Sequence, residues 1–228
     1  MRRLLAPKCL DEMKRFRAVI FDMDGLLLDT ERQALVSFNR VCDQLGLGDQ
    51  EHVFARCIGA NREAGWKALE DGLKDKVDIQ TFASTWDALH MQSTAEQPVP
   101  LKEGVFELLD YIAAHDVPCA IATSTSTERA TQKLAKAGLI DRFAAITCGD
   151  HVSRSKPFPD IYLRAATVMQ ADPRECLALE DSENGVRAAV GAGMTVIQIP
   201  DLLQPSPELR ALGHIVLDSL HAVRSHRF

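Results

Sequence analysis

Two carboxylates follow the first strand that the sequence predicts. An apolar run over residues 18–21 leads directly into Asp22, Met23, Asp24 and Gly25. Side chains two residues apart in an extended strand point the same way, so Asp22 and Asp24 converge just beyond the strand, where open α/β sheets bind ligands. Like charges this close repel each other unless a cation lies between them or one carboxylate is protonated. Both arrangements occur in catalytic sites.

Such a pair of carboxylates has the chemistry for phosphoryl transfer. One carboxylate can attack phosphorus and form an aspartyl-phosphate. Its neighbour, as a carboxylic acid, can protonate the departing alkoxide and later deprotonate water. The alternative is a solvated turn, because Asp-x-Asp-Gly also occurs in loops and calcium sites.

A hydroxyl-rich loop follows a second apolar strand. Thr123 and Ser124 stand in a run of alanine, threonine and serine over residues 122–127. Hydroxyls and free backbone N–H groups at the start of a helix hold phosphate oxygens well. Threonine and serine are also favoured there as helix caps, so the loop taken alone fits either interpretation.

Lys156 stands in a proline-containing run over residues 155–159. The prolines fix the turn, so the lysine is presented by a rigid frame. Its ammonium is a compact charge that can offset a phosphoryl group and an attacking carboxylate. An ordinary surface lysine is the alternative.

A fourth group of residues ends another apolar strand, where Glu180, Asp181 and Ser182 precede a helix. Helix starts favour acids, and Ser182 can cap the helix. Capping does not explain acids at two separate strand ends, whereas a divalent cation does. Mg²⁺ takes carboxylates, water and substrate phosphate as ligands, and we expect Asp22, Asp181 and the main-chain carbonyl of Asp24 to hold it.

Strands and helices alternate over most of the chain. We expect strands at 18–21, 119–123, 144–148, 176–179, 194–199 and 215–217, and helices at 104–115, 128–137, 160–169 and 183–191. Strands separated by helices imply crossover connections, hence an α/β fold with a Rossmann-like, doubly wound parallel sheet.

The segment 31–96 breaks this alternation. It reads as several amphipathic helices without a convincing strand, and residues 97–100 after it form a stiff, proline-containing linker. We therefore expect a catalytic core of residues 1–30 plus 97–228 and an inserted all-α helical cap of residues 31–96. A helical module above a catalytic strand end is well placed to act as a lid.

The composition favours a small diffusible substrate. The 228 residues carry a formal charge of -6, which argues against general affinity for nucleic acid or an anionic membrane surface. No long apolar run predicts a membrane span. Six cysteines without CxxC spacing indicate a reducing compartment, so we expect a cytoplasmic protein, either a monomer or a weak homodimer.

The order of these motifs is specific. Asp-x-Asp-Gly, a threonine after a strand, Lys-Pro-x-Pro-Asp and Glu-Asp-Ser follow one another, and in this the chain resembles the haloacid dehalogenase superfamily, in its phosphatase and phosphomutase branch with a helical cap. The resemblance implies Asp22 as nucleophile, Asp24 as general acid and base, Thr123 and Lys156 on the phosphoryl group, and Asp181 on Mg²⁺. It also implies support of Lys156 or the metal shell by Glu180.

Within that branch the run over residues 21–31 is similar to the pseudouridine-5'-phosphatase group. The placement of Arg62 is similar to the substrate-binding stretch of β-phosphoglucomutases, which makes Arg62 a candidate for a distal phosphate or sugar. We also assign Gly25, Ser124 and Glu180 to the surroundings of the substrate. The mutases carry a histidine where this chain has Ala34, which disfavours a mutase.

These patterns predict a Mg²⁺-dependent phosphatase that acts on a sugar phosphate or nucleoside monophosphate through an aspartyl-phosphate. One alternative is a β-phosphoglucomutase-like sugar phosphomutase. Another is a non-catalytic metabolite-binding protein with the same fold, since a fold alone does not establish a function.

Overall fold

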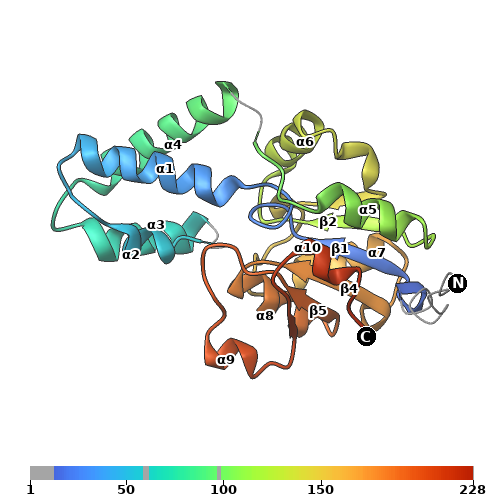
Figure 1. Ribbon diagram of the computed structural model, residues 1–228. Helices are drawn as coiled ribbons and strands as arrows, with labels where there is room; N and C mark the ends of the chain where they lie inside the picture. Colours follow the sequence, from blue (N-terminus) through green and yellow to red (C-terminus); the bar gives the residue numbers. More distant parts are fainter. Residues whose placement is uncertain (1–12, 59–61, 97–98, 228) are drawn as a thin grey trace, which may run out of the picture.

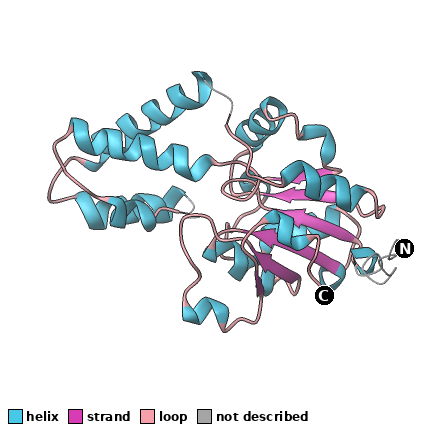
Figure 2. Ribbon diagram, viewed as in Figure 1, coloured by secondary structure: helices cyan, strands magenta, loops and turns pink. Residues whose placement is uncertain are grey.

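A six-stranded parallel sheet forms the centre of the molecule. The computed structural model describes residues 13–58, 62–96 and 99–227. The strand order is β3-β2-β1-β4-β5-β6, and every pair is parallel. The strands are β1 (Ala18–Phe21), β2 (Cys119–Ala122), β3 (Ala145–Thr147), β4 (Cys176–Glu180), β5 (Thr195–Gln198) and β6 (Ile215–Val216). The predicted α/β fold is confirmed, and Figure 2 shows the strand arrows pointing towards a group of helices at one side.

The helices fall into two sets. Those of the insert are α1 (Thr30–Gln44), α2 (Glu51–Ala55), α3 (Arg62–Leu73) and α4 (Ile79–Glu96). Those around the sheet are α5 (Val105–Ala113), α6 (Thr127–Lys136), α7 (Asp160–Val168), α8 (Glu183–Gly191), α9 (Pro207–Arg210) and α10 (Leu220–Val223). Short 3₁₀ turns are η2 (Met13–Arg15), η3 (Ile140–Arg142), η4 (Gly149–His151) and η5 (Pro173–Glu175).

The predicted strands and the helices between them begin and end within two residues of the predictions. The four-residue helices α9 and α10 were not predicted, because one turn is too short to show a helical period.

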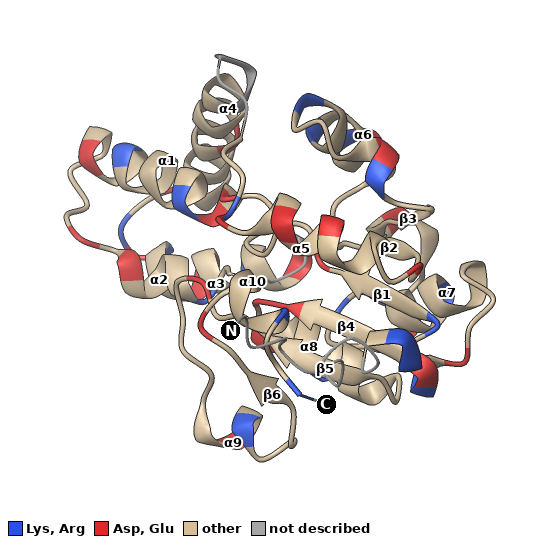
Figure 3. Cartoon of the chain, turned by 45° about the vertical axis from the view of Figure 1, so that its right-hand side comes forward, with Lys and Arg blue, Asp and Glu red and all other residues tan. Residues whose placement is uncertain are grey.

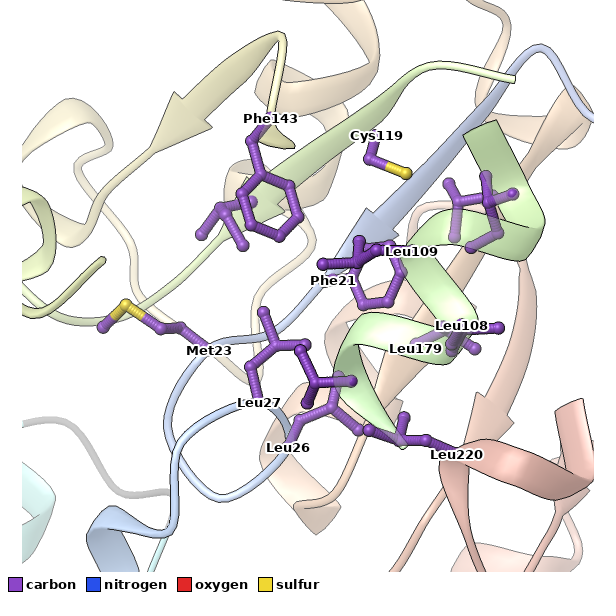
Figure 4. Packing of buried hydrophobic residues seen from close by; sticks show 14 of the residues in the cluster. Phe21, Met23, Leu26, Leu27, Leu108, Leu109, Cys119, Phe143, Leu179 and Leu220 are labelled. Carbon is purple, nitrogen blue, oxygen red and sulfur yellow. The ribbon is translucent and has the colours of Figure 1, made fainter. Parts of the chain in front are cut away.

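Successive strand residues pack on opposite faces of the sheet. Val19 and Phe21 of β1 belong to a cluster with α5, α6 and α10, whereas Ala18 and Ile20 belong to a second cluster with α7 and α8. Figure 4 shows Phe21 within the first cluster. Because both faces are covered, the strand interiors are apolar, and polar side chains occur only at the first or last residue of a strand.

The insert has an apolar core of its own. Phe38 of α1, Phe54 of α2 and Phe82 of α4 are buried together, and the Phe38 ring lies 5.4 Å from Phe54 and 5.2 Å from Phe82, centroid to centroid. In Figure 1 these helices lie beside the sheet rather than against either face. The division into a core and a cap at the predicted boundaries stays a prediction.

Backbone hydrogen bonds join the two ends of the insert, and an ion pair links them to the segment after β5. Leu28 and Leu101 form an antiparallel bridge, and the backbone N–H of Asp29 donates to the carbonyl of Pro100 at 2.8 Å. Lys102 then pairs with the buried carboxylate of Asp201, beyond β5, at 2.5 Å. The insert is therefore anchored next to the carboxyl ends of the central strands.

No helix in the described ranges is both long and apolar enough to cross a membrane. The described cysteines, which exclude Cys9, all carry free thiols.

The aromatic core of the insert generates a stability prediction. We expect Phe38→Ala to lower the free energy of unfolding by about 3 to 5 kcal/mol, because it removes a fully buried ring and leaves a cavity. Urea denaturation followed by circular dichroism measures this. Val36→Ala, on the same helix but 68% exposed, is the control and should cost less than about 0.5 kcal/mol. Equal effects of the two substitutions would contradict a packed core in the insert.

Candidate active site

The predicted motifs meet at one edge of the sheet. β1 lies between β2 and β4, and parallel strands bring Asp22, Thr123 and Asp181 to the same edge just beyond their carboxyl ends. A cavity of about 530 Å³ opens there. Its lining residues come from the strand ends, from α6 and from the insert: Asp22, Asp24, Thr30, Glu31, Ala34, Cys57, His90, Thr123, Ser124, Thr125, Ser126, Arg129, Lys133, Lys156 and Ser182.

Lys156 joins two of the acids. Its Nζ donates to Asp22 Oδ1 and to Glu180 Oε1, each at 2.5 Å, and the three residues are at most 6% exposed. Burial raises the pKa of Asp22 to about 8 against the attraction of Lys156, and Glu180 adds to the rise. Burial alone would lower the pKa of Lys156, but the two carboxylates reverse this and raise it. Lys156 therefore remains an ammonium ion next to Asp22.

Glu180 is held by the protein itself. Tyr162 OH donates to its Oε1 at 2.7 Å, and the backbone N–H groups of Asp181 and Ser182 donate to its Oε2 at 3.1 and 3.3 Å. A Cβ at Gly185 would collide with this carboxylate. With its oxygens occupied by protein donors, and with no part in the cavity lining, Glu180 contacts Lys156 rather than the space where a substrate would lie.

Asp24 has a different set of partners. Lys133 Nζ of α6 donates to its Oδ1 at 2.6 Å, and Thr125 Oγ1 donates to its Oδ2 at 2.7 Å. Burial alone would raise the pKa of Asp24, but the charge and hydrogen bond of Lys133 outweigh burial, so the pKa lies below its usual value. The hydroxyl-rich loop thus contacts a carboxylate directly, and Ser126 makes no side-chain cap on α6.

The acids at the β1 and β4 ends fit a divalent cation. Asp22, Glu180 and Asp181 each offer an oxygen within 4.8 Å of the others. Asp181 Oδ1 is buried, and no hydrogen-bond donor in the described part of the chain reaches it. A Cβ at Gly25 would strike the Asp181 carboxylate. Burial and the charge of Asp22 raise the pKa of Asp181, as expected where a cation would relieve the repulsion.

The remaining predicted residues are placed as follows. Thr123 and Ser124 line the cavity, and Thr123 Oγ1 accepts from the backbone N–H of Thr125 at 3.1 Å. Gly25 adopts a left-handed φ of 88°, and its N–H donates to the Leu28 carbonyl at 2.8 Å. Arg62 begins α3, but its side chain lies outside the described residues.

Sequence reasoning missed several residues at this site. Arg129 and Lys133 of α6 and His90 of α4 line the cavity, and Tyr162 donates to Glu180 behind it. A signal existed for two of them. Arg129 and Lys133 are four residues apart on a helix that starts at the hydroxyl-rich loop, so both side chains share one helix face.

Comparison with known proteins identifies relatives of this arrangement. The family model described as haloacid dehalogenase-like hydrolase matches residues 19–199. The phosphorylated carbohydrates phosphatase of Thermotoga maritima is 33% identical, over 78% of this chain and 82% of its own. A Drosophila melanogaster protein named "Probable pseudouridine-5'-phosphatase" is 30% identical, over 83% and 84%. The β-phosphoglucomutase of Bacillus subtilis is 27% identical, over 90% and 94%.

A solved structure is similar to this chain in both fold and sequence. The crystal structure of a hydrolase from Deinococcus radiodurans R1, with bound phosphate and sodium, superposes with a TM-score of 0.78 at 28% identity. The match covers 93% of this chain and 95% of that one.

The cluster of Asp22, Glu180 and Asp181 generates a metal-binding prediction. We expect Mg²⁺ to raise the thermal unfolding midpoint of the protein, because an ion that binds only the folded state stabilises it, by about 2.7 kcal/mol at one hundred times its Kd. Differential scanning fluorimetry with Mg²⁺ and with a chelator measures the shift. Asp181→Asn should abolish it, whereas Asp141→Asn, an exposed acid on η3, should retain it. A Mg²⁺ shift of the same size in Asp181→Asn would refute this assignment.

Proposed function

Because the chain belongs to the haloacid dehalogenase-like hydrolase family, we propose that it is a Mg²⁺-dependent phosphatase of a small phosphomonoester, either a sugar phosphate or a nucleoside monophosphate. The observation that carries this proposal is the convergence of Asp22, Lys156 and Asp181 in one buried cluster. The names of the phosphatase relatives support the substrate class.

In the first step of the proposed reaction, a carboxylate oxygen of Asp22 attacks phosphorus. The bond from phosphorus to the ester oxygen breaks, and the leaving oxygen takes a proton from Asp24. Lys156, 2.5 Å from Asp22, offsets the charge of the attacking carboxylate and of the phosphoryl group. Thr123 and Ser124, which line the same cavity, supply hydroxyl donors for the phosphoryl oxygens.

In the second step, water attacks phosphorus and gives a proton to Asp24, the bond to Asp22 breaks, and inorganic phosphate leaves. Lys133 favours the ionised form of Asp24, which is the form that this second step requires. The protonated form is required for the first step.

Asp22 and Asp181, together with the main-chain carbonyl of Asp24, would hold the metal. When bound, Mg²⁺ supplies positive charge to the phosphate oxygens and to the acidic cluster.

The phosphomutase alternative keeps the same nucleophile but returns the phosphoryl group to the substrate. Ala34 lines the cavity, and its methyl group cannot exchange protons as the histidine of the mutases does. We therefore favour hydrolysis. We also propose a cytoplasmic enzyme, with the free thiols as support.

Loss of the nucleophile generates the main test. We expect Asp22→Asn to reduce turnover of p-nitrophenyl phosphate with Mg²⁺ on the order of a thousandfold or more, because an amide oxygen does not form the acyl phosphate. Release of nitrophenolate measures this, with Asp141→Asn as control. Retained activity in Asp22→Asn would exclude Asp22 as the nucleophile.

Replacement of the proposed acid and base generates a distinct prediction. We expect Asp24→Asn to slow both steps by roughly 10²- to 10⁴-fold and to leave phosphate trapped on Asp22, which intact-protein mass spectrometry detects as a mass increase.

Incubation of the unmodified enzyme with glucose 1-phosphate distinguishes a phosphatase from a phosphomutase. Free phosphate supports the phosphatase, and an isomeric sugar phosphate supports the mutase.

A further inference from the structure

Three basic side chains gather at one end of the catalytic cavity. His90 reaches it from α4 of the insert, and Arg129 and Lys133 reach it from α6. Figure 3 shows basic residues recurring along α6. The chain as a whole carries a formal charge of -6, so this local accumulation of basic residues is not a consequence of its composition.

Of the two cavity residues from α6, only one pairs with an acid in the described part of the chain. Lys133 pairs with Asp24, but Arg129 is exposed and has no ion-pair or hydrogen-bond partner within the described residues. His90 is partly buried, and burial lowers its pKa, with Lys133 and Arg129 as the next causes. All three side chains line the same cavity. The lowered pKa disfavours a charge on His90, so Arg129 and Lys133 are the main basic groups here.

A solvated helix face is the alternative explanation for Arg129 and Lys133. The side chain of Lys133 is only 16% exposed and is bonded to the cavity carboxylate Asp24, so that part of the face is not solvated. A second cavity of about 390 Å³ is lined by the same three basic residues. They therefore lie where two cavities adjoin, with space on both sides.

We propose that His90, Arg129 and Lys133 form a second anion-binding site, which takes a phosphate or carboxylate carried by the substrate in addition to its scissile phosphate group. The inference rests on the proposed function, which identifies the scissile group as a phosphate. It adds a substrate class, small phosphomonoesters with a second anionic group. The acidic residues around Lys156 do not determine that class.

The dimensions and chemistry of the cavity fit such a substrate. A cavity of about 530 Å³ is within the range that encloses a small ligand. Lys156 and Thr123, which are assigned to the phosphoryl group, line the same cavity as Arg129 and Lys133. The guanidinium of Arg129 presents a fork of donors that matches both phosphate and carboxylate.

Equilibrium binding tests this site separately from catalysis. The experiment uses the full chain carrying Asp22→Asn, which prevents turnover, and titration calorimetry with two pairs of ligands. Fructose 1,6-bisphosphate is compared with fructose 1-phosphate, and 3-phosphoglycerate with glycerol 3-phosphate. We expect the ligand with the second anion to bind at least about tenfold more tightly in one pair or both, the size of one charge-assisted hydrogen bond. The pair that shows the preference identifies phosphate or carboxylate.

Arg129→Gln should remove this preference, whereas Arg164→Gln, which neutralises an exposed arginine on α7, should retain it. The proposal is overturned if both members of each pair bind equally, if neither binds, or if Arg129→Gln keeps the preference. These outcomes are distinguishable from failure of the proposed function, which would appear as absence of p-nitrophenyl phosphate turnover in the unmodified enzyme.

Discussion

The buried ammonium of Lys156, placed between Asp22 and Glu180, is the interaction on which the site depends. Removing one partner of a buried ion pair leaves an uncompensated charge, which costs about 3 to 5 kcal/mol, so the surrounding residues must keep all three in place. Tyr162 and two backbone N–H groups hold Glu180. The absence of a side chain at Gly185 leaves space for that carboxylate. Residues in or directly after β1, β4, α7 and α8 thereby keep the partners of Lys156 in position.

The single positive charge of Lys156 does not balance the acidic groups around it. Asp22, Glu180 and Asp181 bring three carboxyl groups into one buried cluster, and Lys156 is the cation that touches two of them. Burial is the first cause of the raised pKa values of Asp22 and Asp181, and the charges of the neighbouring carboxylates raise them further. The arrangement is suited to receiving positive charge together with an anionic group, which is the requirement of phosphoryl transfer. The family match, over residues 19–199, confirms the predicted resemblance and the expectation of a hydrolase.

Sequence patterns predicted the sheet, and with it the proximity of the acids that end β4 and follow β1 and β4, because both follow from local rules. An apolar run sets each strand, and the polar residue that ends the run must lie at the sheet edge, so Asp22, Thr123 and Asp181 were identifiable without coordinates. Lys133 was not. Its contact with Asp24 spans 109 positions of the chain, and helical periodicity indicates which face of α6 packs on the sheet but not which loop the opposite face meets. Glu180 was assigned both to the surroundings of the substrate and to the support of Lys156. Its hydrogen bonds with Lys156, Tyr162 and the backbone fit the second role.

Lys133 links the chemistry to the proposed anion site. It pairs with Asp24, the proposed acid and base, and it lies beside Arg129, which has no acidic partner among the described residues. In the proposed anion site, a substrate anion that attracts Lys133 would weaken the ion pair between Lys133 and Asp24. Release of Asp24 would therefore accompany binding of a doubly anionic substrate more than binding of a singly anionic one. The proposed anion site would then affect proton transfer by Asp24 as well as substrate affinity, because Lys133 belongs to that site and also contacts Asp24.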